Sequence, residues 1–418
     1  MKSGSAYDAS VGVGHSPSIT HHPSPITPFM PSLLIVAGDP SGDRHAARLL
    51  QQLRARLPGI TAMGLGGPAL REAGVTLLDD VTHRAAIGPF DAASQVRHLW
   101  RARQQVLAAA RQQPPDLALL VDFGDFNLPF IAPYLKRLSI PIAYYISPQL
   151  WAWGQFRLQY VKRFVDRMIV FFPFEATFYQ RAGVPVTWVG HPLIDDAIPT
   201  RSPSEMHELI DLNPRRMTVG LLPGSRYDEV RRLLPVMLQA AVRVSRPMPA
   251  LQWIVPRASS VPLSLFQECT AGLELNVRIT EGPLPEVLQL MDVACVASGT
   301  ATLEAAIAHT PMVVVYRTSW PTYCAARAVV RLPHVALVNI VAQRHLVPEL
   351  LQWQASPRRI ARALTQLLRD DAKRHAMRTA LGEVTQHLGG PGAVDRAAEA
   401  VLALLRMTRP ELSKSKTR

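Results

Sequence analysis

Short apolar runs alternate with longer stretches of helical periodicity along most of this chain. In the first half, runs with the length and β-branched content of buried strands lie at 32–37, 60–64, 117–122, 142–146, 168–172 and 186–189. In the second half, similar runs lie at 218–222, 251–255, 277–280, 293–297 and 312–316. Strands that alternate with helices indicate parallel sheets covered on both faces. The pattern predicts an α/β fold with two doubly wound, Rossmann-like domains that face each other across a central cleft.

Changes in composition along the chain predict where these domains begin and end. The first residues are rich in Ser, Pro, His and Gly, which is typical of a disordered extension. A Pro-containing stretch after residue 191 marks the boundary between the halves. The predicted segments are a disordered extension (1–31), an N-terminal Rossmann-like domain (32–196), a linker (197–215), a C-terminal Rossmann-like domain (216–375), C-terminal helices that could pack back on the first domain (376–408) and a basic tail (409–418).

The amphipathic segment at 94–111 allows two interpretations. Its apolar positions are Val96, Leu99, Trp100, Val106 and Leu107, and its basic positions are Arg97, Arg101, Arg103 and Arg111. A basic helix with an aromatic side chain can lie on an anionic membrane. It can also pack its apolar side on the sheet with the arginines in solvent, and we favour this packing. A second basic-aromatic segment, around Phe156, Arg157 and Arg163, could hold a phosphate or a lipid surface.

The composition narrows the classes of protein and partner. With 418 residues the chain is too long for one core, and with 48% hydrophobic and 18% charged residues it is globular rather than disordered. The formal net charge of +13 indicates anionic partners, such as nucleic acid, lipid headgroups or phosphorylated metabolites. Three scattered cysteines indicate a reducing compartment. No apolar run reaches the ~20 residues that span a bilayer, so a membrane contact would be peripheral.

The loop between the strand at 218–222 and the helix after it is a candidate anion site. Pro223 and Gly224 mark a tight turn, and the helix start beyond it presents free backbone N–H groups. Ser225 adds a hydroxyl, and Arg226 adds a guanidinium that can grip phosphate with two parallel hydrogen bonds. The alternative is an ordinary strand-to-helix turn with a surface arginine. This loop alone favours neither interpretation.

A second loop of the same kind follows the strand at 293–297. Ser298, Gly299 and Thr300 offer small groups and free N–H donors at a helix start, and Glu304 lies one turn further on. A carboxylate there could accept two ribose hydroxyls, although it could also merely offset the helix dipole. Together with the loop of Arg226, this arrangement suits a nucleoside diphosphate.

The first half carries acidic and aromatic residues directly after its predicted strands. Asp122 and Asp125 follow the strand at 117–122, where one carboxylate could serve as general base for a hydroxyl. We assign this chemistry to Asp122 and a partly structural role to Asp125 and Asn127, since such residues also cap local turns. The next strand is followed by Ser147, Trp151 and Trp153. The two indoles either pack in the core or contact an acyl or sugar group. His191, which follows the last strand of this half, is either a cleft residue or part of a hinge.

Other chemistries leave no signature in the sequence. A Walker A lysine, a GxSxG elbow, HExxH and an EF-hand loop are all absent, and so is any nucleic-acid-binding module. We therefore predict no metal, no cofactor and no nucleic-acid partner.

The ordered set of motifs resembles the lipid-A-disaccharide synthase family, whose members are glycosyltransferases with the GT-B fold. The resemblance covers about residues 32–406. The matching segments are VAGDPSGD (36–43), DFGDFN (122–127), YISPQLWAW (145–153), PFE (173–175), VGHP (189–192), LPGSR (222–226), ASGTATLE (297–304), VN (338–339) and PELL (348–351).

This resemblance implies an activity, its substrates and a location. The family transfers a diacylglucosamine group from UDP-2,3-diacylglucosamine to 2,3-diacylglucosamine 1-phosphate (lipid X), with inversion at the anomeric carbon. It implies a cytoplasmic enzyme, peripheral on the anionic inner face of the inner membrane, and leaves a homo-oligomer open. Asp122 matches the family's candidate base, and Asn339 and Glu304 are expected near the UDP. The residues expected at the acceptor and its lipid are Asp39, Ser41, Gly42, Asp91, Asn127, Ser147, Trp151 and Trp153.

The chain departs from the family pattern at three places in the acceptor half. Asp39 and Asp91 stand where the family usually has Glu, which keeps the charge and shortens the reach by one methylene. Phe123 and Gly124 stand where Ala-Pro or Ser-Pro is common. The alternatives to a lipid A disaccharide synthase are another GT-B UDP-sugar transferase, an epimerase, or an inactive lipid-binding paralogue. Asp122, Arg226 and Glu304 together argue against the inactive paralogue.

Overall fold

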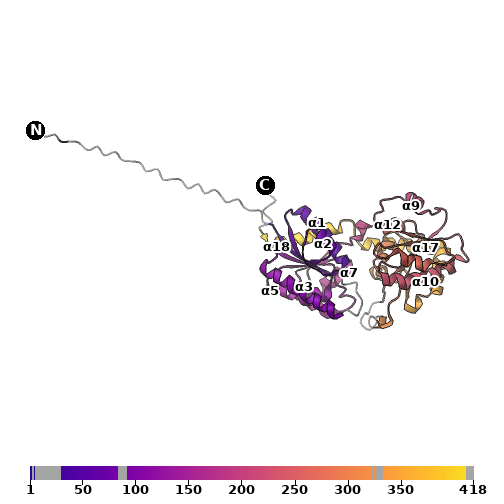
Figure 1. Cartoon of the computed structure of the whole chain (residues 1–418), viewed down its shortest axis with the longest axis horizontal. Coiled ribbons are helices and arrows are strands. Elements are labelled where there is room, and N and C mark those ends of the chain that lie inside the picture. Colours follow the sequence, from indigo (N-terminus) through magenta and orange to yellow (C-terminus); the bar gives the residue numbers. More distant parts are fainter. Residues whose placement is uncertain (2–3, 5–29, 83–91, 322, 325–332, 411–418) are drawn as a thin grey trace.

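The computed structural model describes residues 1, 4, 30–82, 92–321, 323–324 and 333–410 and shows two α/β halves (Figure 1). Each half is built on one parallel sheet, with seven strands in the first half and six in the second. The predicted doubly wound α/β fold is therefore confirmed. Most of the predicted extension at 1–31 and of the tail at 409–418 lies outside the described residues.

The sheet of the first half has the strand order β3-β2-β1-β4-β5-β6-β7, and every neighbouring pair is parallel. The chain starts in the centre of the sheet, moves outward to β3 and returns to the other side of β1. The direction of winding thus reverses between β1 and β4, where ligands bind in such sheets. The strands are β1 (Ser32–Ala37), β2 (Thr61–Gly66), β3 (Thr76–Asp80), β4 (Leu117–Val121), β5 (Ile142–Tyr145), β6 (Arg167–Val170) and β7 (Val186–Trp188).

The central strands are continuous apolar runs because helices cover both faces of the sheet. All residues of β4 are buried, and so are all but the first of β1. Helix α1 buries Ala46, Leu49, Leu50 and Leu53 against the sheet, as its spacing predicted. The helical segments of this half are α1 (Pro40–Arg56), α2 (Pro68–Glu72), α3 (Ala92–Gln112), α4 (Gly124–Phe126), η3 (Asn127–Ile131), α5 (Ala132–Arg137), η4 (Gln155–Arg157), α6 (Leu158–Phe164), α7 (Pro173–Arg181) and α8 (Leu193–Asp196).

The sheet of the second half repeats this topology with the order β10-β9-β8-β11-β12-β13. Its strands are β8 (Thr218–Leu222), β9 (Gln252–Pro256), β10 (Val277–Thr280), β11 (Val293–Ala297), β12 (Met312–Tyr316) and β13 (Glu349–Leu351). Strand β13 was not predicted, because three residues of intermediate burial show no clear periodicity. The helical segments are α9 (Pro203–Ile210), α10 (Tyr227–Ser245), α11 (Leu263–Thr270), α12 (Leu284–Leu288), α13 (Ala301–Ile307), α15 (Leu337–Ala342), η5 (Gln352–Gln354), α16 (Pro357–Arg369), α17 (Asp371–His387) and α18 (Ala393–Thr408).

The chain crosses between the halves twice, and the two crossings lie against each other. The backbone N–H of His191 donates to the carbonyl of Leu388 at 2.8 Å. The Asp195 carboxylate accepts from the N–H groups of Gly392 and Ala393 at 2.7 and 3.2 Å, at the start of α18. Helix α18 then packs on α1, so the last helix of the chain belongs to the first half (Figure 1).

Two segments differ from what their sequence suggested. The predicted linker at 197–215 contains α9, where Met206 is buried, and it is tied to α12 because Thr200 and Arg201 both donate to the Glu286 carboxylate. Helix α3 buries Ala102, Val106, Leu107 and Ala110, and its Leu99 is partly buried against the same core, while Val96 and Trp100 are exposed. The expected single apolar face is therefore wrong at its first part, since small alanines rather than Val96 and Trp100 face the core.

Candidate active site

A cavity of about 510 Å³ lies between the two halves, at the carboxyl ends of the strands. Most of its lining comes from the first half, and the second half contributes Thr300 and Leu337. The lining residues of the first half are Asp39, Ser41, Gly42, His45, Asp122, Phe123, Gly124, Asp125, Ile146, Ser147, Pro148, Gln149, Trp151, Trp153, Arg157, Phe171, Phe172, Glu175, His191 and Leu193.

Asp122 occupies an unusual backbone conformation at the end of β4. Its φ is 42° and that of Phe123 is 48°, in the left-handed region that residues other than glycine seldom adopt. The turn is held because Asn127 Nδ2 and the Tyr144 hydroxyl both donate to the Asp122 carbonyl. The Phe123 ring occupies space that Gly38 leaves free. A Cβ at position 38 would lie 2.2 Å from this ring. Such strain often marks functional sites.

Asn127 stabilises this turn from the protein interior rather than from the cavity. It is fully buried, and its amide nitrogen also lies 3.4 Å from the Val121 carbonyl and 3.5 Å from the Val36 carbonyl. The expectation that Asn127 contacts the acceptor is therefore not met. Its role here is structural, which sequence reasoning had considered in part.

The two carboxylates of this turn lie in different electrostatic surroundings. Burial, together with the negative charges of Asp39 and Asp125, raises the pKa of Asp122 to about 6. The Asp125 side chain is 72% exposed and forms an ion pair with the guanidinium of Arg157. A carboxyl with a raised pKa accepts a proton more readily, which favours Asp122 as the candidate base.

Asp39 combines a structural role with a place in the cavity wall. Its carboxylate accepts hydrogen bonds from the N–H groups of Gly42 and Ser41, at 3.0 and 3.3 Å, and thereby caps the start of α1. Asp is among the best N-cap residues, so the departure from the family's Glu is compatible with this loop. Asp91, the other predicted acidic position, lies outside the described residues.

The wall formed after β5 and β6 is aromatic and rigidly packed. The Trp151 indole donates to the Glu175 carboxylate at 3.1 Å and stands edge-on to Phe174. The Phe172 N–H also donates to Glu175, and burial raises the pKa of this carboxyl to about 7. Ser147 Oγ lies 2.8 Å from the Tyr179 hydroxyl. Both tryptophans thus line the cavity and pack against neighbouring side chains, and their contact with an acyl or sugar group stays a prediction.

Two histidines line the cavity as neutral groups. Burial lowers the pKa of His191 to about 3 and that of His45 to about 4. The Nδ1 atom of His191 accepts from the Leu193 N–H at 3.1 Å, and its ring packs against Phe171 and Phe172. His191 therefore both borders the cavity and belongs to the crossing between the halves. His45 was missed, because a lone histidine inside a helix has no distinctive spacing.

The second half places only part of the predicted nucleotide site at the cavity. Thr300 lines it, while the hydroxyl of Ser298, beside Gly299, donates to the Val335 carbonyl at 3.3 Å. Glu304 lies in the first turn of α13. Burial, together with the charge of Asp196, raises the pKa of Glu304 to about 7.

The loop of Gly224, Ser225 and Arg226 is not among the residues that line the cavity. The Arg226 side chain is 83% exposed and pairs with Glu229 at 3.1 Å, three residues further along α10. The structure therefore does not show the expected opposition of Arg226 and Asp122 across the cavity. The physical reason is local, since the acidic first turn of α10 already supplies a partner for the guanidinium.

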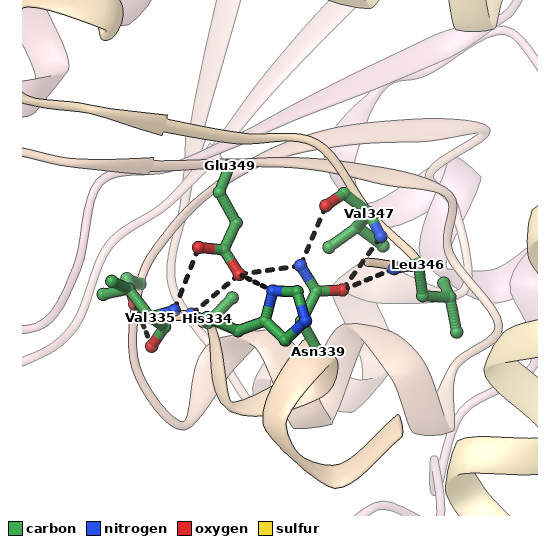
Figure 2. A network of polar contacts seen from close by, with 8 residues as sticks. His334, Val335, Asn339, Leu346, Val347 and Glu349 are labelled. Carbon is green, nitrogen blue, oxygen red and sulfur yellow. Dashed lines mark hydrogen bonds and ion pairs between the residues drawn. The ribbon is translucent and has the colours of Figure 1, made fainter. Parts of the chain in front are cut away.

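Asn339 lies in a closed polar network of the second half (Figure 2). It is fully buried, and its carbonyl oxygen accepts from the N–H groups of Leu346 and Val347, both at 2.9 Å. Its amide nitrogen donates to the Val347 carbonyl at 2.9 Å and to Glu349 at 2.7 Å. All its bonding capacity is thus used inside the domain, and the expected contact between this side chain and a nucleotide would require breaking the network.

Glu349 extends the network to the segment around Val335 (Figure 2). From strand β13, its carboxylate accepts from the N–H groups of Val335 and Ala336, at 2.9 and 3.2 Å. The Val335 carbonyl in turn accepts from Ser298, and Leu337 lines the cavity. The motif positions at 338–339 and 348–351 therefore hold together the segment that includes Val335 and Leu337. Sequence reasoning did not assign a role to Glu349, because its partners lie in other segments of the chain and most of them are backbone groups.

Two facing Rossmann-like halves, a cavity between them and a last helix that returns to the first half define the GT-B class of fold. Similar solved structures include UDP-GlcNAc 2-epimerase from Neisseria meningitidis bound to UDP-GlcNAc (TM-score 0.60, 13% identity, 90% of this chain and 100% of that one). MurG from Acinetobacter baumannii is also similar (TM-score 0.57, 14% identity, 89% and 99% covered). At these identities the likeness concerns the fold alone.

The chain belongs to the lipid-A-disaccharide synthase family, whose model matches residues 33–403. The lipid-A-disaccharide synthase of Anaeromyxobacter dehalogenans is 44% identical over 375 residues, which cover 90% of this chain and 97% of that protein. That of Myxococcus xanthus is 42% identical over 375 residues, with 90% and 98% covered. The protein is thus a UDP-sugar-dependent glycosyltransferase of lipid A biosynthesis, as its motifs indicated.

The raised pKa of Asp122 predicts an acid limb in the rate profile. We expect kcat/KM to fall below a pH of about 6, where Asp122 takes up a proton. Asp39→Asn removes a like charge and keeps an N-cap residue, so the pKa of Asp122 should fall and the limb should move to lower pH. The exposed Asp371→Asn is the control. An acid limb that stays in place in Asp39→Asn would contradict this coupling.

The network around Glu349 predicts a large effect on stability. Glu349→Ala removes an acceptor shared by two backbone N–H groups and by the Asn339 amide, so we expect a loss of about 2 kcal/mol in the free energy of unfolding. Glu281→Ala, which removes an exposed partner of Arg257, should cost less than about 1 kcal/mol. Denaturant unfolding of both variants measures the difference, and equal losses would speak against the network.

Proposed function

We propose that this glycosyltransferase transfers the diacylglucosamine group of UDP-2,3-diacylglucosamine to the 6-hydroxyl of 2,3-diacylglucosamine 1-phosphate. The products are UDP and the β-1,6-linked lipid A disaccharide 1-phosphate. The observation that carries the proposal is the family membership, which covers both halves and the cavity between them. Asp122 in that cavity supplies the base that such a transfer requires.

A single displacement accounts for the change from an α-linked donor to a β-linked product. Asp122 takes the proton of the acceptor 6-hydroxyl as its oxygen bonds to the anomeric carbon from the face opposite the diphosphate. The bond from that carbon to the diphosphate oxygen breaks, and UDP leaves with the electron pair. With a pKa of about 6, Asp122 is ionised at neutral pH and still basic enough to accept this proton.

The nucleotide is proposed to bind the second half, beside the loops that follow β8 and β11. These strands are neighbours in a parallel sheet, so both loops lie at the same edge. The loop of Ser298 and Thr300 supplies N–H groups, and Glu304 accepts the ribose hydroxyls. Arg226 reaches the diphosphate after it leaves Glu229, as the halves close on the substrate. A solved MnaA–UDP structure shares this fold with a TM-score of 0.61 at 12% identity.

Turnover of defined substrates tests this proposal. Purified protein is incubated with UDP-2,3-diacylglucosamine and lipid X, and UDP and the disaccharide are measured. Asp122→Asn keeps the size of the side chain and removes the base, so we expect a rate lower by roughly 10²–10⁴-fold. Asp371→Asn is the matched control, since its side chain is 88% exposed on α17. Wild-type protein that forms no disaccharide would overturn the proposed reaction, and a near-normal rate in Asp122→Asn would remove this residue from the role of base.

We also propose a peripheral contact with an anionic membrane through α3 and η3. Val96 is 66% exposed, Trp100 52% and Phe130 45%. The Arg103 guanidinium lies 4.8 Å from the centre of the Trp100 ring and donates to the Phe130 carbonyl. A cluster of exposed apolar side chains with a cation between them suits a lipid surface. Among the described residues, no helix is long and apolar enough to cross a bilayer.

Binding to vesicles of anionic phospholipid tests this contact. The double variant Val96→Ser, Trp100→Ser should bind about tenfold more weakly, because it removes exposed apolar surface that would enter the lipid. Leu209→Ser serves as the control, since Leu209 is 64% exposed on α9 of the second half. Equal binding of the wild type and the double variant would rule out this surface.

A further inference from the structure

Arg157 is a buried cation whose position the activity described so far does not use. It ends the short helix η4, is only 5% exposed and lines the cavity together with Asp122 and Asp125. Charged side chains are almost never buried unless they are paired or bind a ligand. Its partner among the described residues is Asp125, whose side chain is 72% exposed.

Among the described residues that line the cavity, Arg157 is the one lysine or arginine. The other charged groups there are carboxylates, namely those of Asp39, Asp122, Asp125 and Glu175. The two histidines carry no charge near neutral pH, because burial lowers the pKa of each to about 4 or below. An anionic group that enters this cavity therefore meets one fixed positive charge, at Arg157.

The guanidinium has unused donors. Its Nη1 donates to Asp125, while its Nε is buried and has no hydrogen-bond partner among the described residues. A guanidinium carries five N–H donors, and one exposed carboxylate satisfies only part of them. Because the Asp125 side chain is largely in solvent, its movement away from Arg157 costs little free energy when a stronger anion binds.

The chain around Arg157 forms a fixed platform for its side chain. The guanidinium carbon lies 4.1 Å from the centre of the Trp153 ring, which is a cation–π contact. Gly154, with a φ of 69°, lies on another side of the guanidinium and leaves room for it. A Cβ at position 154 would lie 2.5 Å from Nη2 and 2.8 Å from Nε of Arg157. A guanidinium held in one plane is suited to grip two oxygens of a phosphate with parallel hydrogen bonds.

We infer that Arg157 is the phosphate-binding residue of this cavity and holds a phosphate group of a substrate close to Asp122. The inference rests on the proposed function, because both proposed substrates carry phosphate. One source is the phosphate monoester of the acceptor, and the other is the diphosphate of the donor. Both present the same chemistry to Arg157, so the experiment has to separate them.

Two acceptors that differ only in phosphate provide the main test. KM is measured with 2,3-diacylglucosamine 1-phosphate and with the same sugar without phosphate, and UDP binding is measured by calorimetry. Arg157→Lys keeps the charge but loses the planar fork, and Arg157→Gln loses both. If Arg157 holds the acceptor phosphate, KM for the phosphorylated acceptor should rise by about tenfold or more, while KM for the other acceptor stays within about twofold.

A second variant displaces the guanidinium without touching its charge. Gly154→Ala places a methyl group where Nη2 and Nε lie, so it should produce the same selective loss as Arg157→Gln. Arg181→Gln is the matched control, because Arg181 is an exposed arginine at the end of helix α7 and is not among the residues that line the cavity. It removes the same charge and should leave both KM values and the UDP affinity unchanged.

Each outcome decides the inference. A loss confined to the phosphorylated acceptor supports Arg157 as the site of the acceptor phosphate, and a loss of UDP affinity supports it as the site of the donor diphosphate. An equal loss with both acceptors and unchanged UDP affinity would overturn the inference and leave only a structural ion pair. Calorimetry of UDP and of the phosphorylated acceptor needs no turnover. It therefore tests Arg157 even if the wild type forms no disaccharide and the proposed function fails.

Thermal unfolding establishes whether each variant folds, and Gly154→Ala replaces Arg157→Gln if the Arg157→Gln protein does not fold. Folded Gly154→Ala protein with unchanged KM for the phosphorylated acceptor and unchanged UDP affinity would also overturn the inference. Rescue of function in Arg157→Lys relative to Arg157→Gln would show how much of the effect comes from charge alone.

Discussion

The architecture depends on one constraint of parallel sheets, namely that all strands of a sheet end at the same edge. In each half, a central pair of strands lies where the direction of winding reverses, β1 with β4 and β8 with β11. The loops that follow these strands must then gather at one edge, however far apart they are in sequence. This is how Asp39 and Asp122 come to share a cavity wall, and how Thr300 comes to border it from the other half.

Burial then gives these polar groups their chemistry. Desolvation raises the pKa of Asp122 and of Glu175, because a carboxylate is less stable away from water. It lowers that of His191 for the same reason, so the histidine is neutral. The resulting cavity is rich in carboxyl groups and, among the described lining residues, has one fixed cation at Arg157. The proposed base and the proposed anion-binding group thus lie in one wall, which suits a reaction between a hydroxyl and phosphorylated sugars.

Much of the fold could be predicted from the sequence, and the site only in part. The sequence predicted the long apolar strands and the periodic helices, because the pattern of each is local. Strand β13 was not predicted, because its three residues are too few to show such a pattern. Loop residues such as Asp122 were placed correctly at the cavity, since they follow predicted strands. Asn127 and Asn339 were expected to contact substrates, but both are buried, with their amides bonded to protein groups. The sequence alone does not distinguish an asparagine that stabilises a turn from one that binds a ligand.

By itself, the sequence determined the class of fold, the motifs of the family and the reaction that they imply. Tertiary structure alone decided which of the motif residues line the cavity, because that depends on contacts between distant segments. In the tertiary structure, the Arg226 side chain pairs with Glu229, and the Glu349 carboxylate accepts from backbone N–H groups. The tertiary structure also buries Arg157 beside Trp153, where the absence of a Cβ at Gly154 leaves room for the guanidinium. Burial and hydrogen bonding across the chain set these roles, and local residue patterns do not record them.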